Sequence, residues 1–126
     1  MIADLRTGKI IATAFCEGKC ADFALFKRSK TPLTRMGLCL ADSGYQGLDK
    51  LHANARTPQK KSKKRPLTEE DKANNRALSS QRIGCEHVMG RLKVFKILSE
   101  RYRNRRKRFG LRFNLIAALC NLARNE

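Results

Sequence analysis

The chain has 126 residues, of which 41% are hydrophobic and 31% are charged, a balance typical of one compact domain and not of a disordered chain. Its 28 Lys and Arg residues against 11 Asp and Glu residues give a formal net charge of +17. Charge of this size disfavours the compact state unless a polyanion compensates it, so the composition predicts nucleic acid as the partner, with a solvated basic surface as the alternative.

Membrane and secretory proteins are disfavoured by the sequence. It contains no apolar run of about 18 residues, the length that a membrane span requires. Residues 1–15 lack the basic region, apolar stretch and cleavage site of a signal peptide. The five cysteines are odd in number and are expected to be reduced thiols; Cys16 and Cys20 have no second Cys/His pair at zinc-ligand spacing. We therefore expect a cytoplasmic protein.

The first zone of the chain predicts a hairpin and a short helix. Residues 5–9 predict a turn between two strands, of which the second covers residues 10–15 and is rich in β-branched side chains. Residues 21–29 predict a short helix, because Phe23 and Phe26 lie three positions apart.

An acid follows the next apolar run. Residues 38–41 are apolar and end on Asp42, and Gly44 and Gly47 come directly afterwards. A strand that delivers a carboxylate into a glycine-rich turn is the expected geometry.

A basic loop is expected at about residues 56–66. Six of the ten residues from 56 to 65 are cationic, namely Arg56, Lys60, Lys61, Lys63, Lys64 and Arg65. Because such a block repels itself, we expect it to stay mobile until it meets phosphate; an ordinary solvated loop is the alternative.

Two helices complete the pattern. The first is predicted to begin after Thr68, with Asp71 as its capping-box partner, and to continue to about Leu98. Residues 101–108 are basic again. The last helix is predicted over about residues 109–124 and is expected to close the core, with an apolar stripe of Phe109, Phe113, Ile116 and Cys120 beside Leu115, Leu119 and Leu122.

One face of the long helix presents an acid flanked by two cations. At about 100° per residue, Arg82 and Lys93 fall within about 40° of Glu86, whereas Val88 and Leu92 fall on the opposite, apolar side. Gly90 lies one turn from Glu86, although glycine costs roughly 1 kcal/mol in a helix, which indicates close approach to the backbone there. The alternative is that Arg82 and Glu86 form an ordinary surface pair, four residues apart.

The sequence resembles insertion-sequence transposases of the DDE type, in particular the insertion-sequence-five group. Asp42-x-Gly44-Tyr45-x-Gly47 is similar to the signature around their second catalytic aspartate, and Arg82-x3-Glu86-x6-Lys93 to the signature around their catalytic glutamate. The similarity covers nearly the whole chain and includes the pairs Asn75-Arg76, Arg82-Ile83 and Glu86-His87 and the run Tyr102-Arg103-Asn104-Arg105.

The resemblance implies one partial catalytic domain over residues 1–126, with an α/β, ribonuclease-H-like mixed sheet and flanking helices. It implies metal-dependent cleavage and strand transfer of DNA, with Asp42 and Glu86 as catalytic ligands of Mg²⁺ or Mn²⁺. It also implies a nucleoid-associated protein whose partner is DNA, at insertion-sequence ends and target sites. A second copy in a homo-oligomer or a full-length transposase is the further partner that it implies. The expected DNA-binding residues are Arg82, Lys93, Lys60, Lys61, Lys63, Lys64, Arg65, Arg103, Arg105 and Arg106.

Departures from the family pattern favour an incomplete site. Ser79 stands where many relatives have Tyr, and Cys20-Ala21-Asp22 stands where relatives often have His-Asp. The strand with the first catalytic Asp is expected upstream of this chain's first hairpin, so neither Asp4 nor Asp22 is assigned its role. We expect the truncated domain to be inactive alone and to expose a sheet edge along residues 10–15. A non-catalytic nucleic-acid-binding protein, derived from a decayed transposase or unrelated to one, is the alternative.

Overall fold

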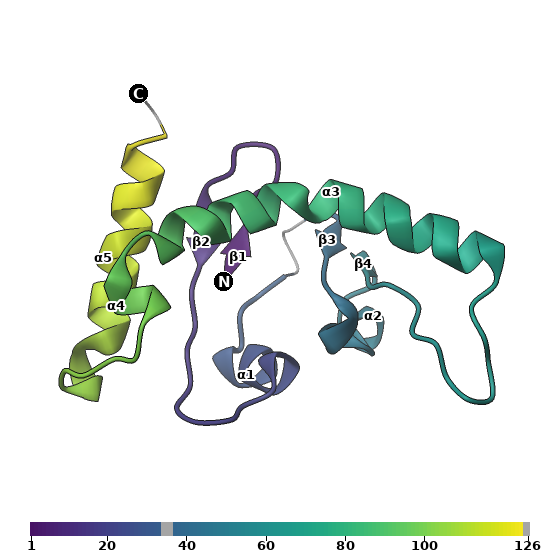
Figure 1. Cartoon of the computed structure of the whole chain (residues 1–126), viewed down its shortest axis with the longest axis horizontal. Coiled ribbons are helices and arrows are strands. Elements are labelled where there is room, and N and C mark those ends of the chain that lie inside the picture. The colour runs from purple at the N-terminus through teal and green to yellow at the C-terminus, as the bar shows by residue number, and fades with distance from the viewer. Residues whose placement is uncertain (34–36, 125–126) are drawn as a thin grey trace. The chain divides into compact units, whose positions relative to one another are not determined.

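The computed structural model describes residues 1–33 and 37–124, and its elements are labelled in Figure 1. The chain divides into two compact units, which are described separately. The terminal unit comprises Met1–Phe15 and Ile83–Glu126, and the central unit comprises Cys16–Arg82. Helix α3 (Glu69–Lys93) starts in the central unit and ends in the terminal unit.

The terminal unit opens with the predicted hairpin. Strands β1 (Ile2–Ala3) and β2 (Ile10–Ala12) pair antiparallel, so the second strand is shorter than residues 10–15. Asp4 Oδ1 accepts the Arg6 N–H at 2.8 Å, and Gly8 adopts a φ of +65° that favours glycine. The hairpin follows from these turn residues because each bond closes within a few positions.

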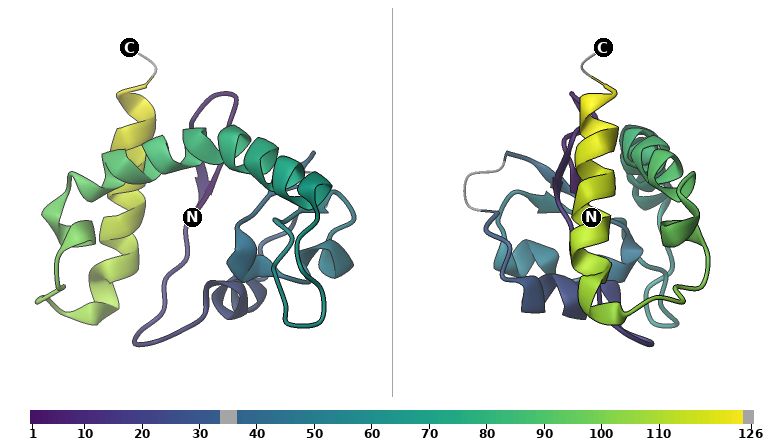
Figure 2. Two further views of the ribbon diagram at one scale, coloured as in Figure 1. Left: turned by 45° about the vertical axis from the view of Figure 1, so that its right-hand side comes forward. Right: turned by 90° about the vertical axis from the view of Figure 1, so that its left-hand side faces the viewer.

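The core of this unit joins three segments that are distant in sequence. Val88 and Leu92 of α3, Ile116 and Ala117 of α5 (Phe109–Leu122) and Ile10 of β2 are buried together. Between α3 and α5 the chain turns back through α4 (Lys96–Ser99) and the 3₁₀ turn η2 (Arg106–Arg108), as Figure 2 shows. The predicted core face of the long helix is therefore confirmed at Val88 and Leu92.

Helix α3 ends at Lys93 and not near Leu98. The backbone is extended at Phe95 and restarts as α4, which allows Ile97 and Leu98 to pack against the same core. Phe95 itself is left 38% exposed. No proline or glycine marks this break, so tertiary packing and not local sequence ends the helix.

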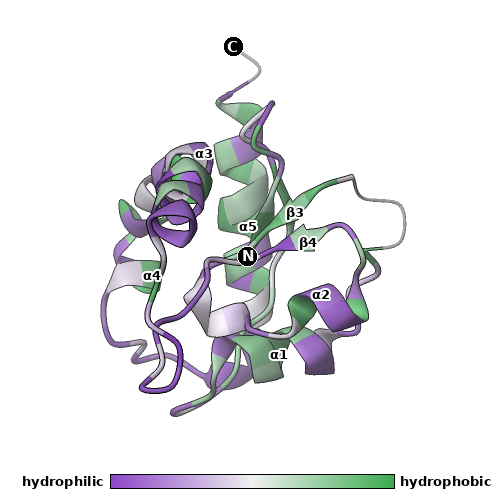
Figure 3. Ribbon diagram, turned by 90° about the vertical axis from the view of Figure 1, so that its right-hand side faces the viewer, coloured by the Kyte–Doolittle hydropathy of each residue, from purple (hydrophilic) through white to green (hydrophobic). Residues whose placement is uncertain are grey.

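Helix α5 has two apolar faces, and only one is buried. Phe113, Ile116 and Cys120 pack on the core as expected. Leu115, Leu119 and Leu122, which the sequence placed beside that stripe, are more than half exposed. The expectation that Leu119 closes the core is wrong. Hydropathy could not decide it, because α5 is apolar around most of its circumference, as its largely green colour in Figure 3 shows.

The central unit holds the second strand pair. Strands β3 (Cys39–Leu40) and β4 (Ala55–Arg56) run parallel, with α1 (Asp22–Ser29), the 3₁₀ turn η1 (Ser43–Tyr45) and α2 (Leu48–Leu51) around them. Leu48 is its most buried side chain, at 1% exposure. The Tyr45 ring lies 6.0 Å from Phe23 and 6.2 Å from Phe26, centroid to centroid. These rings attach the turn after Asp42 to the predicted helix α1.

The start of α3 is confirmed in detail. Thr68 and Asp71 exchange two hydrogen bonds of 3.1 Å, each from a backbone N–H to the other's side chain. The described residues contain two separate two-stranded sheets, one antiparallel and one parallel. The α/β class is therefore confirmed, whereas a single ribonuclease-H-like sheet remains a prediction.

Candidate functional site

Asp42 lies directly beyond strand β3, as the sequence predicted. The Ala41 N–H still donates to Arg56 O at 3.0 Å, so strand pairing continues to the residue before the acid. Asp42 caps the turn η1, because its Oδ1 accepts the Gly44 N–H at 2.7 Å. Its side chain remains 45% exposed. The turn fixes one carboxylate oxygen and leaves the group accessible to solvent.

Arg82 is the cation beside this carboxylate. Its Nη2 lies 3.9 Å from Asp42 Oδ2, and its side chain is only 24% exposed. Among the residues that the structure describes, Asp42 is thus the ion-pair partner of Arg82, and the surface pair between Arg82 and Glu86 is not formed. A pair this long and this exposed contributes about 0–1 kcal/mol, so stability alone gives little reason for it.

Glu86 lies one turn after Arg82 in α3 and is exposed. Lys93 is the last residue of the helix and is exposed as well. Both belong to the terminal unit, whereas Asp42 and Arg82 belong to the central unit. A Cβ added at Gly90 would meet no described atom within 4 Å, so the surface one turn beyond Glu86 is open.

The basic loop is anchored near its start, at Pro58 and Gln59. Gln46 Nε2 donates to Pro58 O at 2.7 Å, and Asn75 forms two hydrogen bonds with the backbone of Gln59. Ser62 and Arg65 exchange backbone hydrogen bonds of 3.1 and 3.3 Å across the tip. All five expected DNA-binding residues of the loop are exposed: Lys60, Lys61, Lys63, Lys64 and Arg65.

The second basic segment belongs to the terminal unit and presents Arg103, Arg105 and Arg106 as exposed residues. Tyr102 ties the segment to α5, since its hydroxyl accepts from Arg112 Nη1 at 2.8 Å and donates to Arg105 O at 3.3 Å. The Tyr102 ring also meets the Phe109 ring edge-on at 4.9 Å. The two basic segments are therefore carried by different units.

The side chains of Asp42 and Glu86 have the ligand type that Mg²⁺ prefers, namely carboxylate oxygens. A two-metal site needs more than these two groups. Within residues 1–33 and 37–124, no group of three or more His, Cys, Asp or Glu side chains is placed to hold a metal ion. All five cysteines are free thiols.

Two other acids serve local structure. Asp4 accepts hydrogen bonds in the hairpin turn, and bonding to the Thr7 side chain and the Arg6 backbone lowers the pKa of its carboxyl. Asp22 lies in the first turn of α1, where an acid complements the helix dipole. These positions give no support to either residue as a third catalytic acid.

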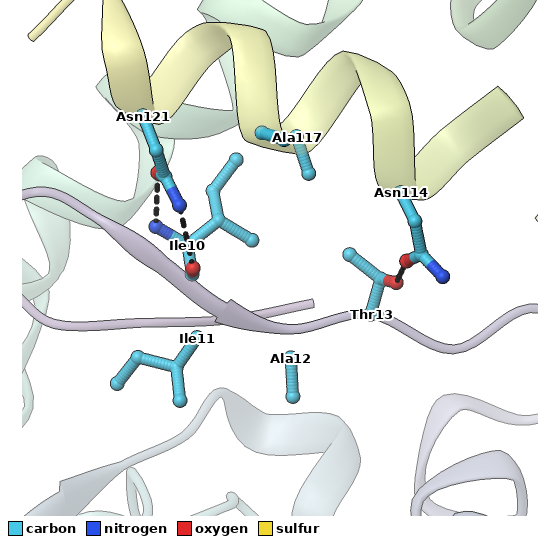
Figure 4. Close-up of a pocket in the computed structure, with 8 residues that line it drawn as sticks. Ile10, Ile11, Ala12, Thr13, Asn114, Ala117 and Asn121 are labelled. Carbon is cyan, nitrogen blue, oxygen red and sulfur yellow. Dashed lines mark hydrogen bonds between the residues drawn. The ribbon is translucent and has the colours of Figure 1, made fainter. Parts of the chain in front are cut away.

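An open pocket of about 340 Å³ lies between β2 and α5, and Figure 4 shows the residues that line it. Asn121 bonds to both backbone groups of Ile10, and Thr13 donates to Asn114. The lining contains no charged side chain and no thiol. The pocket is therefore a packing seam without catalytic groups.

Three amide side chains escaped the sequence interpretation: Gln46, Asn75 and Asn121. Asn75 is part of a motif pair and Gln46 of the glycine-rich signature, yet nothing in their spacing predicted contacts with a loop. Each binds a backbone group that is distant in sequence, by 12, 16 and 111 residues respectively.

No helix of the described residues combines the length and apolar character needed to cross a membrane.

Comparison with known proteins agrees with these motifs. The family described as DDE superfamily endonuclease matches residues 2–121. Over 121 residues the chain is 46% identical to the "Probable transposase for insertion sequence element IS702" of Microchaete diplosiphon. The alignment covers 96% of this chain and 44% of that relative, so the chain spans less than half of the relative's length. No solved structure matches. The chain belongs to the DDE-type insertion-sequence transposases.

Proposed function

We propose that this chain supplies part of the catalytic domain of a transposase that cuts and joins DNA at insertion-sequence ends. The observation that carries the proposal is the arrangement around Asp42. A carboxylate beyond a strand is half-exposed and faces a cation from helix α3, the helix that also carries Glu86. Because an exposed carboxylate contributes little to packing, this arrangement supports a chemical role for Asp42.

DNA is the proposed partner because a large positive charge destabilises the folded chain by self-repulsion, and a polyanion would compensate it. The formal net charge is +17, and both basic segments present exposed cations on anchored backbone. Arg82 and Lys93 are proposed to contact phosphate or to orient the acids. With few aromatic side chains beside these cations, contacts to phosphate and not to base edges are expected.

Asp42 and Glu86 are proposed as ligands of Mg²⁺ or Mn²⁺. When bound, such ions activate the attacking oxygen and stabilise the leaving oxygen of a phosphodiester. In this chain the Gly44 N–H would hold Asp42 Oδ1 in place, and Arg82 would balance its charge. A two-metal site needs a further carboxylate, which we propose a full-length transposase supplies, so this chain by itself is expected not to cleave DNA.

The test combines binding with cleavage. Affinity for an arbitrary duplex is measured between about 50 and 200 mM salt, where a steep loss of affinity is expected. Supercoiled plasmid is then incubated with Mg²⁺ or Mn²⁺ and the wild type or the Asp42→Ala, Glu86→Ala variant. Nicking by the wild type alone would show that the acids already form a complete site. Undetectable DNA binding at low salt would contradict the proposal.

Metal binding is tested separately from cleavage. Calorimetric titration with Mn²⁺ should give weak binding to the wild type and weaker binding to Asp42→Asn and Glu86→Gln. These substitutions keep the size of each side chain and remove its charge. Equal Mn²⁺ affinity in all three proteins would remove both acids from the proposed ligand set.

A further inference from the structure

The base of the basic loop is held by two amide side chains from two different elements. Asn75 of α3 uses both ends of its amide on one residue, since its Oδ1 accepts the Gln59 N–H at 2.8 Å and its Nδ2 donates to Gln59 O at 3.0 Å. Gln46, which follows η1, donates to Pro58 O at 2.7 Å. Two adjacent loop residues, Pro58 and Gln59, are thus each held through their backbone by an amide side chain.

These hydrogen bonds act against the mutual repulsion of the loop's cations. Residues 57–68 connect β4 to α3 and carry five cations, Lys60, Lys61, Lys63, Lys64 and Arg65. Such a cluster repels itself and favours spread conformations. A bidentate amide fixes the orientation of the Gln59 backbone as well as its position. The backbone bonds between Ser62 and Arg65 then define the path of the tip.

We propose that Gln46 and Asn75 are positioning residues for DNA binding, which hold the loop so that its cations meet backbone phosphates as a preformed surface. This inference rests on the proposed function, namely that the chain binds DNA. Ordering a flexible, charged segment at the moment of binding would cost affinity, and holding it in advance avoids part of that cost.

The same bonds connect the loop to the candidate catalytic acid. Gln46 directly follows the turn η1 that Asp42 caps, and the Tyr45 ring of that turn packs against Phe23 and Phe26. Loop and acid therefore share one support within the central unit. A phosphate held by the loop would stand in a fixed relation to Asp42.

The salt dependence of DNA binding distinguishes the effect of the loop's conformation from the effect of its charge. Asn75→Ala leaves every cation in place, so the slope of log affinity against log salt should stay as in the wild type, while affinity falls about three- to tenfold at each salt concentration. Lys60, Lys61, Lys63 and Lys64→Gln removes charge, so here the slope itself should decrease, by about 0.9 for each lost phosphate contact.

The matched control is Asn74→Ala. Asn74 is the preceding residue of α3, is exposed, and makes no side-chain hydrogen bond among the described residues. Both substitutions favour the helix equally, so unfolding is not expected. Binding is measured by fluorescence anisotropy with the same duplex for all variants. Trypsin cleavage at the loop lysines of the free protein should be faster for Asn75→Ala than for Asn74→Ala.

A double-mutant cycle decides whether Asn75 acts through the loop. In the background with the four lysines neutralised, Asn75→Ala should have little further effect on DNA affinity. An undiminished effect there, or equal affinities of Asn75→Ala and Asn74→Ala, overturns the inference. If Asn75→Ala loses its helical circular dichroism, Gln46→Ala replaces it in the same cycle and is held to the same outcomes. If the wild-type protein binds no DNA, the proposed function and this inference are both wrong. Faster trypsin cleavage of Asn75→Ala would in that case show only that Asn75 holds the loop.

Discussion

The side chain of Asn121 bonds to Ile10 as a neighbouring strand would. Its Oδ1 accepts the Ile10 N–H at 2.7 Å and its Nδ2 donates to Ile10 O at 2.9 Å, across 111 residues of sequence. The edge of β2 that faces away from β1 is therefore covered at Ile10 by helix α5. The expectation of an open sheet edge along residues 10–15 is wrong at this position, because the Asn121 amide occupies the backbone groups of Ile10 that a further strand would pair with.

Asn121→Ala is expected to destabilise the protein by about 1–3 kcal/mol, since it leaves two backbone groups of Ile10 without partners. Asn114→Ala is the matched control on the same helix, because among the described residues the Asn114 side chain bonds to the Thr13 hydroxyl and to no backbone group. Urea denaturation of both variants measures the difference. Equal stabilities would show that water replaces the Asn121 amide at no cost.

Ile116→Ala should lower the free energy of unfolding by about 2–5 kcal/mol, because Ile116 is 8% exposed and belongs to the core. Leu119→Ala lies on the same helix with 55% exposure and should stay within about 0.5 kcal/mol of the wild type. Thermal unfolding of the pair tests which face of α5 is buried. A larger loss for Leu119→Ala would mean that the exposed leucines are covered in solution.

Gly90→Ala should raise stability by up to about 1 kcal/mol, since an added methyl group meets no described atom and alanine favours the helix. If DNA approaches the backbone at this point, the same substitution should weaken DNA binding. Gly84→Ala is the control, where the new methyl group would contact Leu5 Cδ2 at 3.5 Å. Tighter or unchanged DNA binding by Gly90→Ala would remove any functional reason for the glycine.

Neutralising Lys60, Lys61, Lys63 and Lys64 to Gln should weaken DNA binding and its salt dependence without lowering the melting temperature, since all four side chains are exposed. The control neutralises Lys9, Lys19, Lys30 and Lys50, which are exposed outside the basic segments and change the net charge equally. Equal losses of affinity in the two variants would mean that net charge and not the loop determines binding. A large drop in melting temperature would mean that the loop lysines support the fold.

Short-range features could be predicted from the sequence because the partners lie within a few residues of one another. The hairpin turn after β1, the capping box of Thr68 and Asp71, and the acid-to-glycine turn at Asp42 all close bonds across two or three positions. Such bonds need no partner that is distant in sequence, so residue type and spacing are enough to predict them. The family of the chain could be recognised for a related reason, since its motifs are also short and ordered along the sequence.

Only the tertiary structure decided which of the competing surfaces is buried and which polar group finds a distant partner. Along α5, the stripe with Ile116 and the stripe with Leu119 are both apolar, and contact with Val88, Leu92 and Ile10 selects the former. The end of α3 at Lys93, the parallel pairing of β3 with β4 and the hold of Asn75 on Gln59 have no local signature either. They depend on groups brought together by the whole fold, because hydrophobic burial has no direction of its own and an amide can serve any backbone that comes within reach.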